Sequence, residues 1–421
     1  MSDKYFDGSV ETQYLDPVSY VPNGRCAFEL DGDKMAYLSN MRLLDIGVVA
    51  GAQTNYSKGL GAMALIKNIR LMDARTELSA LRNPAQYLFF KNANRSNAIN
   101  KSNDSYLKRN ALGLEIQSTD GKLAHIYASG PADTTELATN KGYLDLKEVF
   151  PILNVLQVLP TQIFRNLRIE VEFDANILNQ ILVDNSIAIT TLRPVLAVDH
   201  INNAILVNQE INNLMKSGVV WDEILHDNWN IPAVDTTAYA PADVATQNAS
   251  NQSLAYKGKY VERLLICKQL QNKALAIGGG GNAVLGFGGV ASSYAVLNQT
   301  TQYRVNGRNI IPGFNGVNRP NERLGILSDE WGSVNGFIGS NLYKWSNRAA
   351  SLSDPNEAGQ MSWDCVRLGQ RVADLQVQIQ RTNQRDADVL APTNEALTIN
   401  AYGECKKAMA VMAGSYNIVF A

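Results

Sequence analysis

A strict alternation of apolar and charged side chains at residues 167–173, LRIEVEF, restricts the fold of this chain more than any other sequence feature. Successive side chains of a β-strand point to opposite faces of the sheet, so the four apolar residues would share one face. Strands with one dry and one wet face are typical of antiparallel sandwiches and barrels, whereas strands of parallel sheets are apolar on both faces. The pattern therefore predicts an antiparallel β protein.

The alternation returns about half a chain later. Residues 375–380, LQVQIQ, repeat it, and Val171 and Val377 are 206 residues apart. IAIT at 187–190 similarly resembles LTIN at 397–400, and IRL at 69–71 resembles YRV at 303–305. The last pair has a longer offset, which would need an insertion early in the second copy, for which residues 272–292 are the candidate. We interpret these pairs as two copies of one fold.

One amphipathic helix is predicted at 204–217, between the two copies, where it would connect them. Its apolar face is formed by Val207, Ile211, Leu214 and Met215. Asn202 or Asn203 would cap its start, and Gly218 stands where a C-terminal glycine belongs.

A shorter helix is predicted to begin at Asp145, with Glu148 three residues later as in a capping box, and Pro151 would keep it short. The polar tracts at about 92–110, 227–254 and 306–323 are expected to be surface loops.

Charge, hydrophobicity and cysteine spacing each argue against particular classes of protein. The 421 residues include 38 Lys and Arg and 40 Asp and Glu, and this net charge of −2 argues against a dedicated nucleic-acid binder. No apolar run approaches the roughly 18 residues of a membrane helix. The N-terminus is polar and acidic, unlike a secretory signal. The four cysteines are far apart and are expected to be free thiols in a reducing compartment. They are Cys26, Cys267, Cys365 and Cys405.

The glycine-rich stretch 278–289 invites a nucleotide-binding interpretation that its residues do not support. Aligned with a P-loop, it has Phe287 and Gly288 where lysine and serine or threonine are required. As a dinucleotide fingerprint it lacks the acidic residue about 20 positions later. We expect a close-packed or flexible loop.

The histidines are too few and too scattered for most metal sites. They are His125, His200 and His226. His226 beside Asp227 is interpreted as an exposed polar pair rather than a catalytic dyad. Asp329-Glu330 is expected to be a turn rather than a cation site.

Asp31-Gly32-Asp33 resembles part of a calcium loop, but Arg42 stands at the twelfth position, where glutamate is needed. We expect a hairpin turn between residues 28–30 and 35–37. A cluster of aromatic residues could stack sugar rings, although burial at a subunit or domain interface is the favoured interpretation. Its members are Trp331, Phe337, Tyr343 and Trp345. No catalytic, cofactor-binding or metal-binding residue is therefore predicted, no cofactor is expected, and the chain is not expected to be an enzyme.

Three nearby segments resemble a known family. YLDLKEVFP at 143–151, LPT at 159–161 and FRNLRIEVEF at 164–173 are similar to a stretch of the double jelly-roll major capsid proteins of the tectivirus–adenovirus lineage. That lineage includes virophages, Polinton-like viruses and the large nucleocytoplasmic DNA viruses. MRLLD at 41–45 and residues 64–70 also lie where such proteins have early strands. The resemblance implies an all-β chain of two consecutive eight-stranded antiparallel jelly rolls with few short helices.

The same resemblance implies a domain order: an N-terminal arm at 1–20, a first jelly roll at 21–203, a connector helix at 204–218 and a second jelly roll at 219–421. It implies a structural subunit of an icosahedral capsid, assembling as pseudo-hexagonal homotrimers that tile the shell. Expected partners are other trimers, penton proteins and minor capsid proteins, with no specific nucleic acid and no membrane span. An internal membrane beneath the shell is compatible with this. The location would be the virion, after assembly inside the host cell.

Two alternatives stay open at this stage. The aromatic cluster at 331–345 would suit a carbohydrate-binding β-sandwich spike or fibre protein. A minor or vertex capsid protein of the same fold would share all of the features above.

Overall fold

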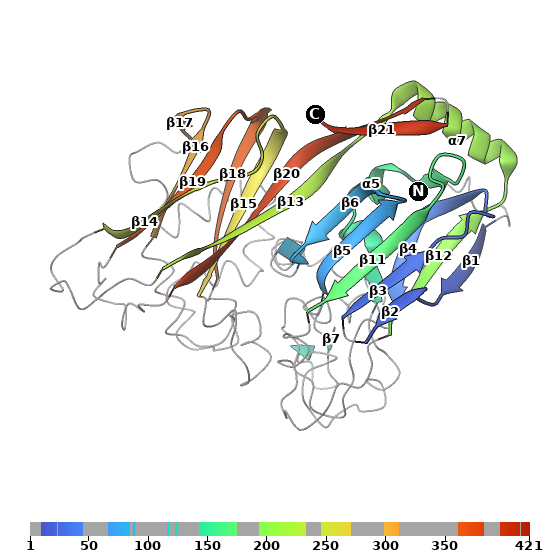
Figure 1. Cartoon of the computed structure of the whole chain (residues 1–421), viewed down its shortest axis with the longest axis horizontal. Helices are drawn as coiled ribbons and strands as arrows, with labels where there is room; N and C mark the ends of the chain where they lie inside the picture. Colours follow the sequence, from blue (N-terminus) through green and yellow to red (C-terminus); the bar gives the residue numbers. More distant parts are fainter. Residues whose placement is uncertain are drawn as a thin grey trace. The chain divides into compact units, whose positions relative to one another are not determined.

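The computed structural model describes residues 10–22, 24–44, 66–84, 87–88, 116–117, 123–124, 143–174, 193–232, 246–270, 299–310, 361–382, 396–412 and 414–421. Two five-stranded antiparallel sheets occupy the first half of the chain (Figure 1). One contains, in spatial order, β1 (Val10–Leu15), β12 (Val195–Ile201), β4 (Ala36–Leu44) and β10 (Val158–Pro160), with β9 (Tyr143–Asp145) also paired to β4. The other contains β2 (Ser19–Val21), β3 (Arg25–Glu29), β11 (Leu167–Phe173), β5 (Ile66–Asp73) and β6 (Thr76–Arg82).

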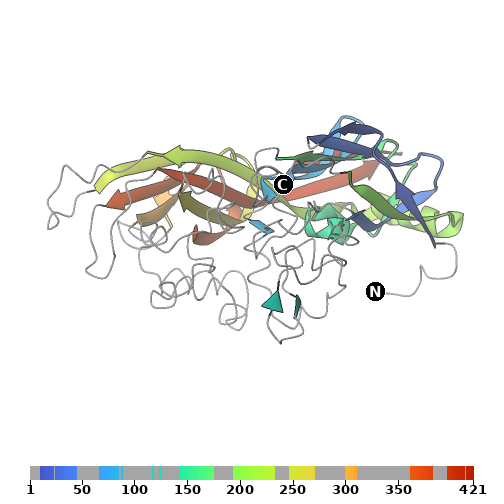
Figure 2. The same cartoon turned by 90° about the horizontal axis from the view of Figure 1, so that it is seen from below.

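Two further sheets occupy the second half. The first contains β13 (Val219–Ile231), β20 (Leu397–Met412), β15 (Tyr260–Leu270) and β18 (Met361–Arg371), with β21 (Ser415–Phe420) paired to β20. The second contains β14 (Thr246–Ser253), β19 (Leu375–Thr382), β16 (Gln299–Val305) and β17 (Arg308–Asn309). A separate ribbon joins β7 (Ile116–Gln117) and β8 (Leu123–Ala124). The long strands β13 and β20 run side by side in both Figures 1 and 2.

Both halves have the same strand order. The eight principal strands are β1, β3, β4, β5, β6, β10, β11 and β12 in the first half and β13 to β20 in the second. Numbered one to eight along the chain, they form one sheet in the order 1-8-3-6 and another in the order 2-7-4-5, in each half. Two four-stranded sheets built from two Greek keys make a jelly roll. The expected fold, two consecutive eight-stranded antiparallel jelly rolls, is therefore confirmed.

The register of the strands confirms two of the three sequence repeats. Val171 on β11 lies opposite Ile69 on β5, and Val377 on β19 lies opposite Tyr303 on β16. The pairs 171 with 377 and 69 with 303 are thus equivalent positions of the two jelly rolls. In the remaining pair, LTIN at 397–400 begins β20, but 187–190 lies outside the described residues, as does the whole candidate insertion at 272–292.

The dry faces of these strands form the cores. All four apolar side chains of β11 are buried, while the charged side chains between them are only half-buried. Val171 and Val377 both have an exposed fraction of 0%. The alternation at 167–173 thus identified the inward face correctly, because a strand between two sheet neighbours can bury only every second residue in its core.

The connector helix was predicted correctly. Helix α7 (Ala204–Ser217) begins after Asn203, whose Oδ1 accepts hydrogen bonds from the backbone N–H of Ile205 at 3.1 Å and of Leu206 at 3.3 Å. On its predicted apolar face, Val207 and Leu214 are buried, whereas Met215 is 42% exposed. Val207 packs in a small cluster with Ala36, Val158 and Ile201.

The second predicted helix is short. Asp145 caps a 3-10 helix, η3 (Leu146–Glu148), by accepting a hydrogen bond from Lys147 N–H at 3.0 Å. After Pro151 the chain forms one more turn, α5 (Ile152–Val155).

The hairpin predicted at residues 31–33 is wrong. Asp31 Oδ1 does accept a hydrogen bond from Asp33 N–H at 3.0 Å, as in a tight turn. However, β3 and β4 on either side of this turn belong to different sheets. The turn therefore carries the chain from one layer of the jelly roll to the other. The loop predicted at 227–254 is also partly wrong, because β13 extends to Ile231 and β14 covers Thr246–Ser253. β14 is almost entirely polar and pairs with β19 through a backbone ladder.

Contacts divide the chain into two compact units. The first contains Met1–Ala85, Asp104–Ile224 and Cys405–Ala421, and the second contains Gln86–Asn103 and Leu225–Glu404. Strands β13 and β20 therefore each have residues in both units. Strand β1 begins within the expected arm at 1–20, and the last 17 residues group with the first unit rather than with the second. That the domains end at the expected boundaries 21–203, 204–218 and 219–421 is still a prediction.

We expect Val171→Asp or Val377→Asp to abolish folding, because each places an unpaired carboxylate in a fully buried site at a cost on the order of several kcal/mol. Urea denaturation followed by tryptophan fluorescence would measure this. Glu172→Gln is the matched control on the outer face of β11 and should cost less than about 1 kcal/mol. Equally mild effects of the buried and outer substitutions would show that the strand register is wrong.

Gly218→Ala should also destabilise the fold. Gly218 has a φ of 61° and a ψ of −169°, and an added Cβ would lie 2.8 Å from the carbonyl oxygen of Met409. Gly414, with a φ of 76°, has nothing within 4 Å of an added Cβ. We expect Gly414→Ala to lower the free energy of unfolding by about 1 kcal/mol and Gly218→Ala by about 2 kcal/mol or more. If urea denaturation shows equal losses of unfolding free energy in the two variants, the contact with Met409 adds no steric cost.

Candidate interaction surfaces

The outer face of the sheet β2–β3–β11–β5–β6 carries polar side chains in rows that cross the strands. The register aligns one row as Val21, Arg25, Glu172, Asn68 and Arg82. The neighbouring row is Ser19, Ala27, Glu170, Arg70 and Ala80. Positive and negative side chains therefore stand beside one another on adjacent strands, where opposite charges stabilise the pairing.

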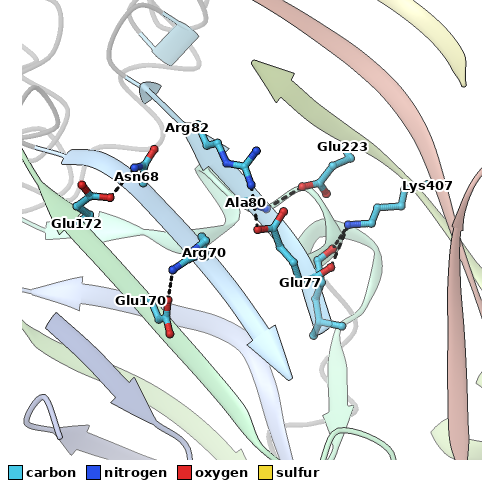
Figure 3. A network of polar contacts seen from close by, with 10 residues as sticks. Asn68, Arg70, Glu77, Ala80, Arg82, Glu170, Glu172, Glu223 and Lys407 are labelled. Atoms are coloured by element: carbon cyan, nitrogen blue, oxygen red, sulfur yellow. Dashed lines mark hydrogen bonds and ion pairs between the residues drawn. The ribbon is translucent and has the colours of Figure 1, made fainter. Parts of the chain in front are cut away.

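Most of these charges are paired within the sheet (Figure 3). Glu172 accepts a hydrogen bond from Asn68 Nδ2 at 2.6 Å and lies 3.1 Å from Lys67 Nζ. The hydrogen bond from Asn68 is the main reason why the pKa of Glu172 lies below its ordinary value, and Lys67 and Arg70 add to it while burial opposes it. Glu170 pairs with Arg70 on β5 and with Arg168 at 2.7 Å.

A cavity of about 540 Å³ opens on this face. Its polar lining consists of Arg25, Asn68, Arg70, Arg82, Glu170 and Glu172. The guanidinium group of Arg25 is exposed and makes no ion pair within the described part of the chain. The cavity thus combines paired charges with one available cation, an arrangement suited to contact with another polar protein surface.

A second polar cluster covers the edge strand β6. An edge strand exposes unpaired backbone N–H and C=O groups to which another chain can add. Here the carboxylate of Glu223 on β13 accepts a hydrogen bond from Ala80 N–H at 2.7 Å. The ammonium group of Lys407 on β20 donates to the carbonyl oxygens of Leu78 at 2.9 Å and Glu77 at 3.1 Å (Figure 3). These side chains occupy the bonding positions that an added strand would need.

Glu223 and Lys407 are buried, with exposed fractions of 2% and 5%. The other carboxylate oxygen of Glu223 accepts a hydrogen bond from Trp221 Nε1 at 2.8 Å. Burial raises the pKa of Glu223 above its ordinary value, while the charge of Lys407 and the hydrogen bond from Ala80 oppose this.

The last strand, β21, also contacts other parts of the first unit through its side chains. The hydroxyl of Tyr416 on β21 donates a hydrogen bond to Asp73 Oδ2 at 2.7 Å, and its ring lies 5.4 Å from that of Phe164. Burial is the main cause that raises the pKa of Tyr416. Lys406 pairs with Asp222 at 2.6 Å. Sequence reasoning did not select these residues, because β13 and β20 each carry several other polar side chains and no local pattern distinguishes Glu223 or Lys407.

The two described histidines have different partners. His200 is buried, with Nε2 at 3.2 Å from Glu11 Oε2. His226 is half-buried rather than exposed, and its Nε2 lies 2.9 Å from Asn400 Oδ1. Asp227 instead accepts a hydrogen bond from Ala255 N–H at 3.3 Å. His226 and Asp227 therefore do not form the expected polar pair. They have separate partners, because adjacent residues of a strand point to opposite faces of the sheet.

The four cysteines are free, as expected, and all four are buried; burial raises the pKa of Cys26 to about 12. His125, the glycine stretch 278–289, Asp329-Glu330 and the aromatic cluster at 331–345 lie outside the described residues. Within the described ranges, no three or more histidine, cysteine or acidic side chains gather as metal ligands would. In the same part of the chain, no helix has the length and apolar character to cross a membrane.

Solved structures of virus capsid proteins have the same fold. VP54 of the virus PBCV-1, fitted into a reconstruction of the virophage Sputnik, is 12% identical, with a TM-score of 0.52 over 98% of this chain and 97% of that one. A chain of the Sputnik virophage structure is 10% identical, with a TM-score of 0.51 over 98% and 88%. The Faustovirus major capsid protein is 7% identical, with a TM-score of 0.53 over 96% and 90%. No protein-family model and no curated protein matches the sequence. The resemblance inferred from the sequence is thus confirmed for the fold.

Glu223 should make stability depend on pH with a defined sign. Its folded-state pKa is raised above the ordinary 4.5, so its stabilising contribution is fully present below pH 4.5 and is lost as the pH rises through the raised pKa. Urea unfolding of the wild type and Glu223→Gln from pH 4 to 8 should therefore show the wild type losing its advantage as the pH increases.

Glu172→Gln is a control whose effect on stability should change with pH in the opposite direction. The pKa of Glu172 is lowered, so its contribution is present above pH 4.5 and is lost as the pH falls through the lowered pKa. A wild-type advantage over Glu223→Gln that is constant, or that grows with pH, would contradict the assignment of a raised pKa to Glu223.

Proposed function

We propose that this chain is a structural subunit of an icosahedral virus capsid. The observation that carries the proposal is the repeated strand order, 1-8-3-6 and 2-7-4-5 in both halves, together with a fold shared with capsid proteins over at least 96% of the chain. The proposal that the chain is not an enzyme rests on the same likeness to structural proteins.

The duplication explains how such a subunit tiles a shell. Two similar jelly rolls in one chain, repeated by a threefold axis, give six similar units around one centre. A closed ring of this kind presents nearly hexagonal sides, so trimers pack against one another with quasi-equivalent contacts. Subunit contacts within the trimer would be large, and contacts between trimers smaller.

The surfaces described above support contacts through side chains rather than through strand addition. The edge of β6 is closed by Glu223 and Lys407, so a neighbouring copy meets no open backbone there. The charged outer face of β11 and β5, with the exposed Arg25, instead suits a partner of complementary charge. We infer that trimers, penton proteins and minor capsid proteins of the virion are the partners, and that assembly takes place inside the host cell.

A minor or vertex capsid protein of the same fold is the second candidate, since the repeated jelly roll supports it equally. The number of copies per particle separates the two, because a major subunit dominates the protein content of the virion. A carbohydrate-binding role depends on the aromatic cluster at 331–345, which lies outside the described residues.

Mass photometry of the purified chain should find a species of three times the chain mass of 46.1 kDa. Negative-stain images of that species should show a pseudo-hexagonal outline, because six similar jelly rolls would surround the axis. The measurement should cover a wide range of protein concentration and salt, since surface ion pairs weaken as salt increases. A chain that stays monomeric under every condition would contradict the proposed function.

A further inference from the structure

Three turns of the second jelly roll meet at one end of its sheets. They are residues 254–259, 306–307 and 372–374. Gly258 N–H donates to the carbonyl oxygen of Val372 at 2.7 Å, and Val372 N–H donates to that of Lys259 at 3.0 Å. Asn306 N–H donates to the carbonyl oxygen of Asp374 at 2.9 Å. Residues far apart in the sequence are therefore neighbours here.

These turns and the strand ends beside them carry an excess of positive charge. We call this surface the basic end; its cations are Lys257, Lys259, Arg304, Arg308 and Arg371. The acidic residues beside them are Asp227 and Asp374, which accept hydrogen bonds from Ala255 N–H and Gln376 Nε2. All of the cations except Lys259 are exposed and have no ion-pair partner among the described residues.

The first jelly roll provides an internal comparison. Its equivalent turns, 30–35, 74–75 and 161–166, are likewise joined by backbone hydrogen bonds. With the adjoining Asp73, they carry three cations and three acids: Lys34, Arg75, Arg165, Asp31, Asp33 and Asp73. This end is balanced in charge, so the fold itself does not require a basic surface at these turns.

One equivalent position shows the same divergence. Arg70 in the first jelly roll lies opposite Glu170 and pairs with it. Arg304 occupies the equivalent position in the second and lies opposite Gln376. The carboxylate that neutralises the arginine in one copy is a neutral carboxamide in the other, which leaves the Arg304 charge available to another molecule.

The chemistry of the basic end fits a row of phosphates. Three of its four exposed cations are arginines, whose planar guanidinium groups bind phosphate oxygens in a bidentate manner. Within the described turns, Tyr256 is buried and no exposed aromatic side chain offers the stacking surface typical of single-strand binding. These turns also present no large apolar side chain of the kind that strengthens attachment to a bilayer.

We propose that the basic end binds the phosphate backbone of duplex DNA without sequence preference. This goes beyond the proposed capsid function and concerns the surface of the single chain. With a net charge of −2 for the whole chain, binding by one copy is weak and depends strongly on salt. In an assembly of many copies, the individual contacts would add through multivalency.

Fluorescence anisotropy with a labelled 30-base-pair duplex of arbitrary sequence tests the proposal at salt concentrations of about 50 to 200 mM. The triple variant Arg304→Gln, Arg308→Gln and Arg371→Gln should bind at least tenfold more weakly at the lowest salt. Its plot of log affinity against log salt should be shallower by up to about 2.7, since each phosphate contact contributes about 0.9 to the slope. Lys34→Gln, Arg75→Gln and Arg165→Gln remove the same charge from the balanced end and should leave affinity and slope unchanged.

Three results would overturn the proposal: no binding of the duplex by the wild type at 50 mM salt, equal losses in the two triple variants, or binding to phosphatidylserine vesicles without binding to the duplex. Urea unfolding of both variants shows whether the substitutions leave the fold intact, as expected for side chains that are exposed or, for Lys34, half-buried. Mass photometry of the same variants reports assembly separately. A chain that forms trimers without binding DNA contradicts this inference alone, whereas one that binds DNA as a monomer contradicts only the proposed function.

Discussion

Hydrogen bonds made by the buried side chains of Glu223 and Lys407 join strands β13 and β20 to the edge strand β6 of the first jelly roll. They satisfy backbone groups of Ala80, Glu77 and Leu78 on the edge strand β6. A buried backbone group that loses its hydrogen-bond partner costs roughly 1–3 kcal/mol. Because β13 and β20 carry these residues and continue into the second unit, the first and last strands of the second jelly roll are also part of the first unit.

The two jelly rolls have kept a common interior and acquired different exteriors. Val171 and Val377 are both fully buried at equivalent positions, since a close-packed core tolerates few changes of volume or polarity. On the outer face, Glu170 and Glu172 correspond to Gln376 and Gln378. Outer side chains are constrained mainly by what they contact, so differences there are consistent with different neighbours for the two copies.

The net charge of the chain does not show that basic side chains are concentrated at one place on its surface. A chain with nearly equal numbers of acidic and basic residues still gathers Lys257, Arg304, Arg308 and Arg371 at one end of the second jelly roll. The first jelly roll pairs its charges within the sheet and balances them at the equivalent end. A subunit built in this way can meet its own copies through one set of faces and a polyanion through another.

The sequence by itself determined the local structure: the inward faces of residues 167–173 and 375–380, the limits of the helix at 204–217, and the presence of two copies of one fold. These follow from side-chain periodicity and capping, which act between near neighbours in the chain. Only the tertiary structure decided which strands pair, so the turn at 31–33 joined two sheets where a hairpin was predicted. The closed edge at β6 and the basic end also appeared only there, because each is assembled from segments tens to hundreds of residues apart, and local propensity carries no information about such contacts.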